Sequence, residues 1–335
     1  MSTVSHAPGG YRHVFHAGNF ADVVKHALLC RLIDYLKQKE RPFFVLDTHA
    51  GPGRYDLTSV EARRSKEHAL GIGRLAACPT WPRLLAPYRD AVAALNDDRP
   101  PGAGAGAGGW RYYPGSPLLL AAWLRPEDRL IACELAPPLQ RRLARTLAGM
   151  EEAAGLAFRQ AQGERAPGER APGEQAPGER HGSRRLARVR AVATDGYAAV
   201  RAYLPPPERR GLVLIDPPYT ELGEEARAFA ALGEGLARFP TGIFALWLPV
   251  KDGRGLERTL RRGRALGVPG TLWVDLCVLP ADNPRRLNGS GLLVVHPPWT
   301  YPDEARAVLT FLAQHLGQNG PGRWRVEWLT PPAAP

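Results

Sequence analysis

Short apolar segments alternate with helical patterns along most of the chain, and this alternation constrains the fold more than any other feature. The apolar segments are bounded by turn residues and predict strands at 43–46, 130–133, 189–192, 212–215, 242–248, 271–278 and 292–295. Apolar residues at helical spacing predict helices at 20–38, 137–151, 197–203, 224–238, 256–266 and 303–315. Strands that alternate with helices indicate an α/β protein with a doubly wound sheet.

Two tracts of biased composition interrupt this pattern. Residues 163–180 repeat the motif GERAP and hold almost nothing that a core could bury, so we expect disorder over 155–185. A Gly/Ala tract at 100–109 is expected to be a flexible loop. It ends a stretch of helical patterns that predicts a small helical insertion at 57–110. The main domain would then comprise 1–56 and 111–335.

The charge balance favours an anionic partner. The chain has 44 Lys and Arg against 33 Asp and Glu, a formal charge of +11, and nucleic acid is the leading candidate. The four cysteines form no CxxC pair, so we expect neither a zinc knuckle nor a disulfide framework. We find no export signal and no apolar run of membrane-spanning length, and we expect a cytoplasmic protein that does not enter a membrane.

Acidic residues and glycines follow the first three strands of the main domain. In a doubly wound sheet, ligands bind beyond the carboxyl ends of the strands. Asp47 ends the first strand and precedes a turn with Gly51 and Gly53, which lacks the patterns GxGxxG and GxxxxGK[ST]. A dinucleotide-dependent oxidoreductase and a P-loop ATPase are therefore disfavoured. Glu134 could accept hydrogen bonds from a ribose diol, and Asp195-Gly196 from an adenine amine, although each alone is typical of an ordinary loop.

The fourth strand opens into Asp216-Pro217-Pro218-Tyr219, the most specific signal in the sequence. This pattern is typical of methyltransferases that act on amino nitrogens of planar groups. The lone pair of such an amine is delocalised, and a carboxylate and a proline carbonyl can accept its two N–H bonds and localise the pair toward a methyl donor. Asp216 and Pro217 would do this while Tyr219 stacks on a flipped base. A carboxylate is too weak a base to deprotonate the neutral amine first, so proton loss should accompany or follow transfer.

A second Pro-Pro turn occurs at 296–300, where no acid precedes the prolines. We expect a structural turn there, with Trp299 as an alternative lining of a base pocket.

The segment before the first strand is rich in His and basic residues. His13, His16, His26 and His49 have no accompanying Cys or carboxylate set at ligand spacing, so no metal site is expected. Arg12, His13, Lys25 and His26 instead suggest contacts to phosphate, to the substrate base or to a cofactor carboxylate, and Tyr11 could stack on a base.

Several motifs together resemble the RlmJ family of bacterial 23S ribosomal RNA adenine-N6 methyltransferases. They are YRH at 11–13, HAGN at 16–19, DVVKH at 22–26, LDTHAG at 46–51, YYPGSP at 112–117 and the DPPY strand. The resemblance implies a Rossmann-like sheet with an inserted helical subdomain, S-adenosylmethionine as cofactor and 23S rRNA as partner, before ribosome assembly is complete. It also implies Asp216 as catalytic acceptor and Tyr11 as an rRNA contact. The cofactor shell that it implies consists of His26, His49, Ser116, Glu134, Asp195 and Gly196. Gly51 of the glycine turn and Asp216 are also expected to contact the cofactor.

Ser116 enters only through this resemblance, because its PGSP turn by itself is typical of a loop. We expect Arg12, His13 and Lys25 among the rRNA contacts, no metal, and a monomer. Two further functions remain open from the residues: methylation of adenine in DNA or of glutamine in a protein, and an RNA-binding assembly protein without turnover.

Overall fold

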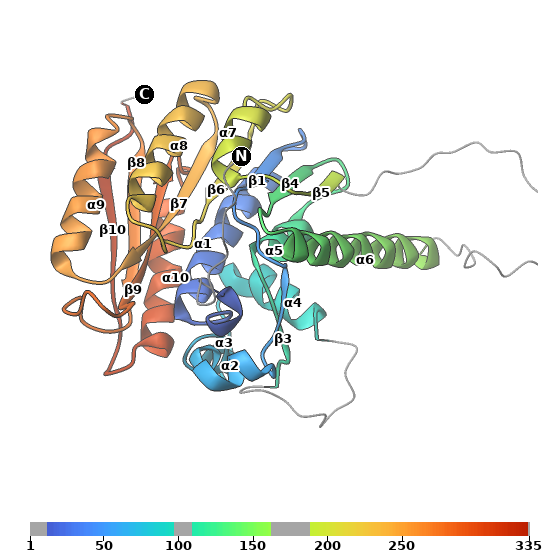
Figure 1. Ribbon diagram of the computed structural model, residues 1–335, viewed down its shortest axis with the longest axis horizontal. Helices are drawn as coiled ribbons and strands as arrows, with labels where there is room; N and C mark the ends of the chain where they lie inside the picture. Colours follow the sequence, from blue (N-terminus) through green and yellow to red (C-terminus); the bar gives the residue numbers. More distant parts are fainter. Residues whose placement is uncertain (1–11, 97–108, 162–187, 334–335) are drawn as a thin grey trace, which may run out of the picture.

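The computed structural model describes residues 12–96, 109–161 and 188–333 of the 335-residue chain, with a central sheet of eight strands (Figure 1). In sheet order the strands are β10 (Arg323–Thr330), β8 (Thr271–Cys277), β9 (Gly289–Val295), β7 (Ile243–Val250), β6 (Gly211–Ile215), β1 (Phe44–Asp47), β4 (Arg129–Cys133) and β5 (Arg188–Val192). The pairs from β7 to β5 are parallel, and β9 is antiparallel to both β7 and β8. The expected α/β class is confirmed.

The register brings the carboxyl ends of the parallel strands to one edge. Asp47, the last residue of β1, lies opposite Ala132 of β4 and Leu214 of β6. Glu134, Asp195 and Asp216 follow the ends of their strands by one to three residues, so all of these acids lie at this edge. We call it the carboxyl edge of the sheet.

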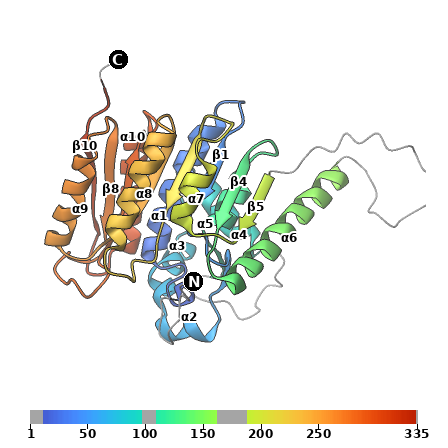
Figure 2. The ribbon, with the colours of Figure 1, turned by 45° about the horizontal axis from the view of Figure 1, so that its top comes forward.

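Alternate residues of each buried strand face two different helical layers. Val45 packs in one apolar core, while its neighbours Phe44 and Leu46 pack in the other, as the two-residue period of a strand requires. The first core is covered by α1 (Phe20–Lys37), α5 (Ser116–Trp123), α6 (Pro137–Ala161) and α10 (Tyr301–Leu316), and the second by α7 (Gly196–Tyr203), α8 (Glu224–Arg238) and α9 (Gly253–Ala265). Figure 2 shows α7, α8 and α9 in front of the sheet.

The helical insertion packs on the first core. It contains α2 (Val60–Ser65), η2 (Glu67–Leu70), α3 (Ile72–Ala76), η3 (Arg83–Leu85) and α4 (Ala86–Ala94), which lie together below the sheet in Figure 1. Tyr88 and Val92 of α4 are fully buried in the same core as α1. A short ladder of β2 (Arg54–Asp56) with β3 (Tyr112–Pro114) joins the start of this segment to its end.

Two expectations from the sequence need correction, and one strand was missed. Helix α6 continues to Ala161, so residues 155–161 are helical although disorder was expected from 155 onward; the Ala-rich end of this segment favours a helix. Ser116 begins α5 and is not in a loop. Strand β10 was not predicted, because its charged residues hide the apolar alternation of an edge strand. The whole GERAP repeat at 163–180 and residues 100–108 of the Gly/Ala tract lie outside the described residues.

None of the described helices combines the length and apolar character needed to cross a bilayer.

Candidate active site

Helix α1 carries polar residues into the interior at the carboxyl edge. It begins after Asn19, whose side-chain oxygen accepts hydrogen bonds from the backbone N–H groups of Ala21 and Asp22. The helix is buried almost throughout, and Lys25 is only 5% exposed. Such burial of a lysine requires compensating charges.

Two carboxylates supply that compensation. The ammonium Nζ of Lys25 lies 3.0 Å from Oδ1 of Asp22 and 2.6 Å from Oδ2 of Asp216. The other oxygen of Asp22 contacts Nε2 of His13 at 3.0 Å and accepts from the backbone N–H of Gly18. Burial alone would lower the pKa of Lys25, but the two carboxylates raise it well above its usual range. Lys25 is therefore charged at any physiological pH.

This arrangement corrects the expectation that Lys25 contacts rRNA. Its ammonium is enclosed between Asp22 and Asp216, so it is not available to a phosphate at the surface. Lys25 instead fixes the carboxylate of the DPPY turn. No spacing rule in the sequence reveals this contact, because 191 residues separate the two side chains.

The DPPY turn is anchored to β7. Tyr219 has a left-handed backbone (φ +53°), and its hydroxyl donates to the backbone carbonyl of Trp247. The two rings lie 5.6 Å apart, and Nζ of Lys25 lies 5.7 Å from the Trp247 ring. The indole N–H of Trp247 donates to Ser290 on β9 (2.9 Å). Trp247 thus contacts both Lys25 and Tyr219, a position that the sequence did not suggest.

Asp47 at the end of β1 is fully buried and hydrogen-bonded to Ser116. The Ser116 hydroxyl donates to Oδ2 of Asp47 over 2.7 Å. Burial, opposed by the hydrogen bond from Ser116 and assisted by the charge of Asp216, raises the pKa of Asp47 to about 7. Ser116 and Asp216, which are 100 residues apart in the sequence, therefore both lie close to the Asp47 carboxyl group.

The start of α7 fits closely against the end of β1. A Cβ atom at Gly196 would lie 2.0 Å from the carbonyl oxygen of Thr48, so only glycine fits there. The hydroxyl of Thr48 is 2.7 Å from Nδ1 of His49, whose ring lies 5.0 Å from that of Tyr197. Burial lowers the pKa of His49 to about 4, which keeps its imidazole neutral.

The remaining strand-end acids bind backbone groups. Oε1 of Glu134 accepts from the backbone N–H of Ala136 (2.8 Å). Oδ1 of Asp195 accepts from the backbone N–H groups of Tyr197 and Ala198 (2.9 Å each) and so caps α7. These bonds hold both carboxylates at the carboxyl edge.

His26 ends a buried chain of hydrogen bonds. Its Nδ1 lies 2.7 Å from the Tyr113 hydroxyl, which lies 2.9 Å from the Tyr88 hydroxyl. Burial lowers the pKa of His26 to about 3, so the ring is neutral. Its Nε2 is buried and has no hydrogen-bond partner among the described residues. An orphaned buried nitrogen of this kind indicates a missing polar partner.

The expected rRNA contacts at the start of the chain are only partly described. Arg12 is exposed and pairs with Glu61 of α2 (2.7 Å). The His13 ring lies 5.1 Å from that of Tyr55, beside its contact with Asp22. Tyr11 lies outside the described residues.

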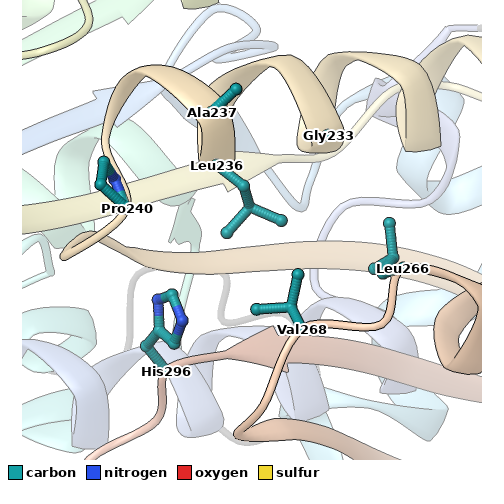
Figure 3. A pocket seen from close by; sticks show the side chains of 7 residues that line it. All are labelled: Gly233, Leu236, Ala237, Pro240, Leu266, Val268 and His296. Atoms are coloured by element: carbon teal, nitrogen blue, oxygen red, sulfur yellow. The ribbon is translucent and has the colours of Figure 1, made fainter.

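A hollow of about 380 Å³ lies elsewhere, and its lining is mostly apolar (Figure 3). Leu236, Val268 and His296 project toward it from α8, from the segment before β8 and from the end of β9. Because β9 is antiparallel to β7, its end at Val295 lies beside the start of β7 and therefore opposite the carboxyl edge. The second Pro-Pro turn follows there, so Trp299 does not line the site; its side chain is exposed.

No group of three or more His, Cys, Asp or Glu side chains in the described chain is arranged to hold a metal ion.

Comparison with known proteins identifies the family. The family model described as "Ribosomal RNA large subunit methyltransferase D, RlmJ" matches residues 40–176 and 174–330. The chain belongs to this RlmJ family. Two relatives named "Ribosomal RNA large subunit methyltransferase J", from Haemophilus influenzae and Escherichia coli, are 36% and 35% identical over 321 residues, which is 96% of this chain and 99% of each relative.

A solved structure from Legionella pneumophila, protein LPL1258, has the same fold. It is 30% identical, aligns with a TM-score of 0.72, and the match covers 93% of this chain and 98% of that one. The RlmJ family comprises large-subunit rRNA methyltransferases, so this chain is an rRNA methyltransferase by membership.

Proposed function

We propose that this enzyme transfers a methyl group from S-adenosylmethionine to N6 of one adenine in 23S rRNA, with Asp216 as proton acceptor. The observation that carries the proposal is the geometry of Asp216, whose Oδ2 is held by Lys25 at 2.6 Å. Within the described chain, Oδ1 of Asp216 makes no hydrogen bond and is the oxygen to which an amine N–H can donate. Family membership supports rRNA as the substrate class.

The acidity of the amine sets the order of methyl and proton transfer. An aryl amine is not acidic enough to lose a proton to a carboxylate, but it becomes acidic once the nitrogen carries the new methyl group. Asp216 and the carbonyl of Pro217 would first orient the amine, and Asp216 would then accept one proton. The Tyr219 ring, anchored on Trp247, would support the flipped base.

The carboxyl edge fits S-adenosylmethionine, which supplies an electrophilic methyl group when bound. Its ribose diol and adenine amine suit the carboxylates of Glu134 and Asp195, which follow the ends of β4 and β5. Gly51 (φ +64°) turns the chain after β1, two residues beyond His49. The orphaned Nε2 of His26 needs a polar partner, and the amino-acid end of the cofactor can provide one.

Contacts with rRNA would come from the start of the chain. Arg12 and His13 lie near the entrance to α1, and Tyr11 directly precedes them. We further propose that the enzyme acts in the cytoplasm as a monomer on rRNA that is not yet fully assembled.

The test is methyl transfer from labelled S-adenosylmethionine to protein-free 23S rRNA. Wild-type protein should label one adenine at N6, and Asp216→Asn should abolish labelling while cofactor binding persists. Asp303→Asn, at an exposed acid of α10, is the matched control and should retain activity. Labelling of duplex DNA or of a protein glutamine in place of rRNA would refute the proposal, as would RNA binding without any methyl transfer.

A further inference from the structure

Three exposed cations near the carboxyl edge have no acidic partner in the described part of the chain. Lys251 and Arg254 lie where β7 passes into α9, and Arg285 lies in the connection from β8 to β9. All three side chains belong to exposed residues, and the described residues provide none of them with an ion pair. We call these residues the basic platform.

A buried asparagine joins the two segments that carry the basic platform. Nδ2 of Asn288, which is fully buried, donates to the carbonyl oxygens of Lys251 (2.5 Å) and Asn283 (3.0 Å). The backbone N–H of Gly253 donates to the carbonyl of Ala281 (3.1 Å). The three cations therefore lie on one fixed surface and not on two independent loops.

Other arginines of α9 show what the basic platform lacks. Arg262 pairs with Glu225 of α8 at 3.1 Å, and Arg264 pairs with Glu327 of β10 at 2.9 Å. At the start of the same helix, the nearby Asp252 uses Oδ1 to cap α9 through the N–H of Gly255. Arg262 and Arg264 near the end of α9 thus have acidic partners, whereas Lys251 and Arg254 at its start have none among the described residues.

The basic platform lies close to the catalytic turn along β7. Trp247 contacts both Lys25 and Tyr219, and Lys251 follows it by four residues. At a strand rise of about 3.3 Å per residue, this separation is about 13 Å. An RNA strand whose adenine reaches Asp216 would therefore pass its neighbouring phosphates near these cations.

We propose that Lys251, Arg254 and Arg285 bind backbone phosphates of the rRNA that flank the target adenine. This inference rests on the proposed function. Binding of phosphates to unpaired cations releases counterions, so it should add affinity and salt dependence without affecting the chemical step.

The experiment compares two triple variants. The first replaces Lys251, Arg254 and Arg285 by Gln; the second replaces Arg41, Arg188 and Arg209, three exposed arginines at the amino ends of β1, β5 and β6, and removes the same charge from the opposite edge. Binding of a 23S rRNA fragment is measured between 50 and 200 mM salt, together with kcat and KM for methyl transfer. Thermal unfolding verifies that each variant is folded.

The first variant should reduce the slope of log K against log salt by about 2, at about 0.7 per phosphate contact. Its KM for rRNA should rise about tenfold with kcat and cofactor binding unchanged, while the second variant stays within twofold of wild type. Equal changes in salt dependence and KM in both variants, or no change in the first, would contradict phosphate binding by the basic platform. Wild-type protein that binds the fragment but methylates no adenine would instead contradict the proposed function. The salt-dependence slopes of the two variants would still show whether the basic platform binds RNA.

Discussion

The ammonium of Lys25 lies 2.6 Å from the carboxylate of Asp216, and this contact joins α1 to the turn after β6. It places a permanent positive charge beside the proposed proton acceptor. Because both side chains are largely buried, water cannot solvate the charge of either one if the other is removed.

Replacement of Lys25 by Met should therefore impair both folding and catalysis. Asp22 and Asp216 would remain buried without a cation, at a cost of about 3 to 5 kcal/mol in the free energy of unfolding. Methyl transfer should fall more than about 100-fold. Chemical denaturation and turnover measure the two effects, and Lys37→Met at the exposed end of α1 is the control. Full activity in Lys25→Met would contradict the assigned role.

The pKa of Asp47 predicts a pH-dependent stability. Burial raises it to about 7, so the folded protein holds this proton where the unfolded chain has already lost it. Below about pH 4, Asp47 is protonated in both states and its ionisation does not affect the free energy of unfolding. As pH rises from about 4 to about 7, that free energy falls, and above about 7 the loss is constant. Asp47→Asn should thus gain stability relative to wild type over this range, by about 3 to 4 kcal/mol at most. Thermal unfolding from pH 4 to 8 tests this; a constant difference between the proteins would refute it.

The hydrogen-bond chain from Tyr88 through Tyr113 to His26 should couple the helical insertion to α1. Tyr113→Phe removes both bonds and leaves two buried partners unsatisfied, which should cost about 1 to 3 kcal/mol in unfolding free energy. Tyr88→Phe removes only one bond and should cost about 1 kcal/mol.

The control is Tyr35→Phe, whose hydroxyl makes no hydrogen bond in the described chain. If Tyr88→Phe proves as costly as Tyr113→Phe, the bond to His26 contributes nothing measurable.

A methyl group at Gly196 should displace α7 from β1. Ala at this position would place Cβ 2.0 Å from the Thr48 carbonyl oxygen, a contact that only a backbone shift can relieve. We expect loss of S-adenosylmethionine binding, measured by calorimetry, together with a lower unfolding temperature. Gly149→Ala on the exposed face of α6, where no atom is within 4 Å, should instead stabilise the helix by up to about 1 kcal/mol. Unchanged cofactor affinity in Gly196→Ala would contradict the cofactor site.

The main sheet was predictable because its central strands are buried on both faces and are therefore short, continuous apolar runs. Seven of its strands were found with ends within three residues of the observed ones. Strand β10 was missed since Arg325 and Glu327, charged residues that fit an edge strand, interrupt the apolar pattern. Helix α5 was missed because an eight-residue apolar run has no distinct helical face.

The site was predictable where chemistry lies at strand ends, and unpredictable where it depends on packing. Asp47, Glu134, Asp195 and Asp216 follow from the parallel topology. The enclosure of Lys25 follows from how deeply α1 is buried, and no local pattern encodes that depth. The contact between Ser116 and Asp47 likewise joins segments 69 residues apart.

The separation of Lys25 from Asp216 also bears on biosynthesis. At 5 to 20 residues per second, a ribosome needs about 10 to 40 s to extend the chain by the 191 residues between them. During that interval Lys25 of α1, which is buried in the folded protein, has no Asp216 carboxylate to pair with. If Asp216 is the proton acceptor, a nascent chain should gain activity only after β6 has been synthesised and docked.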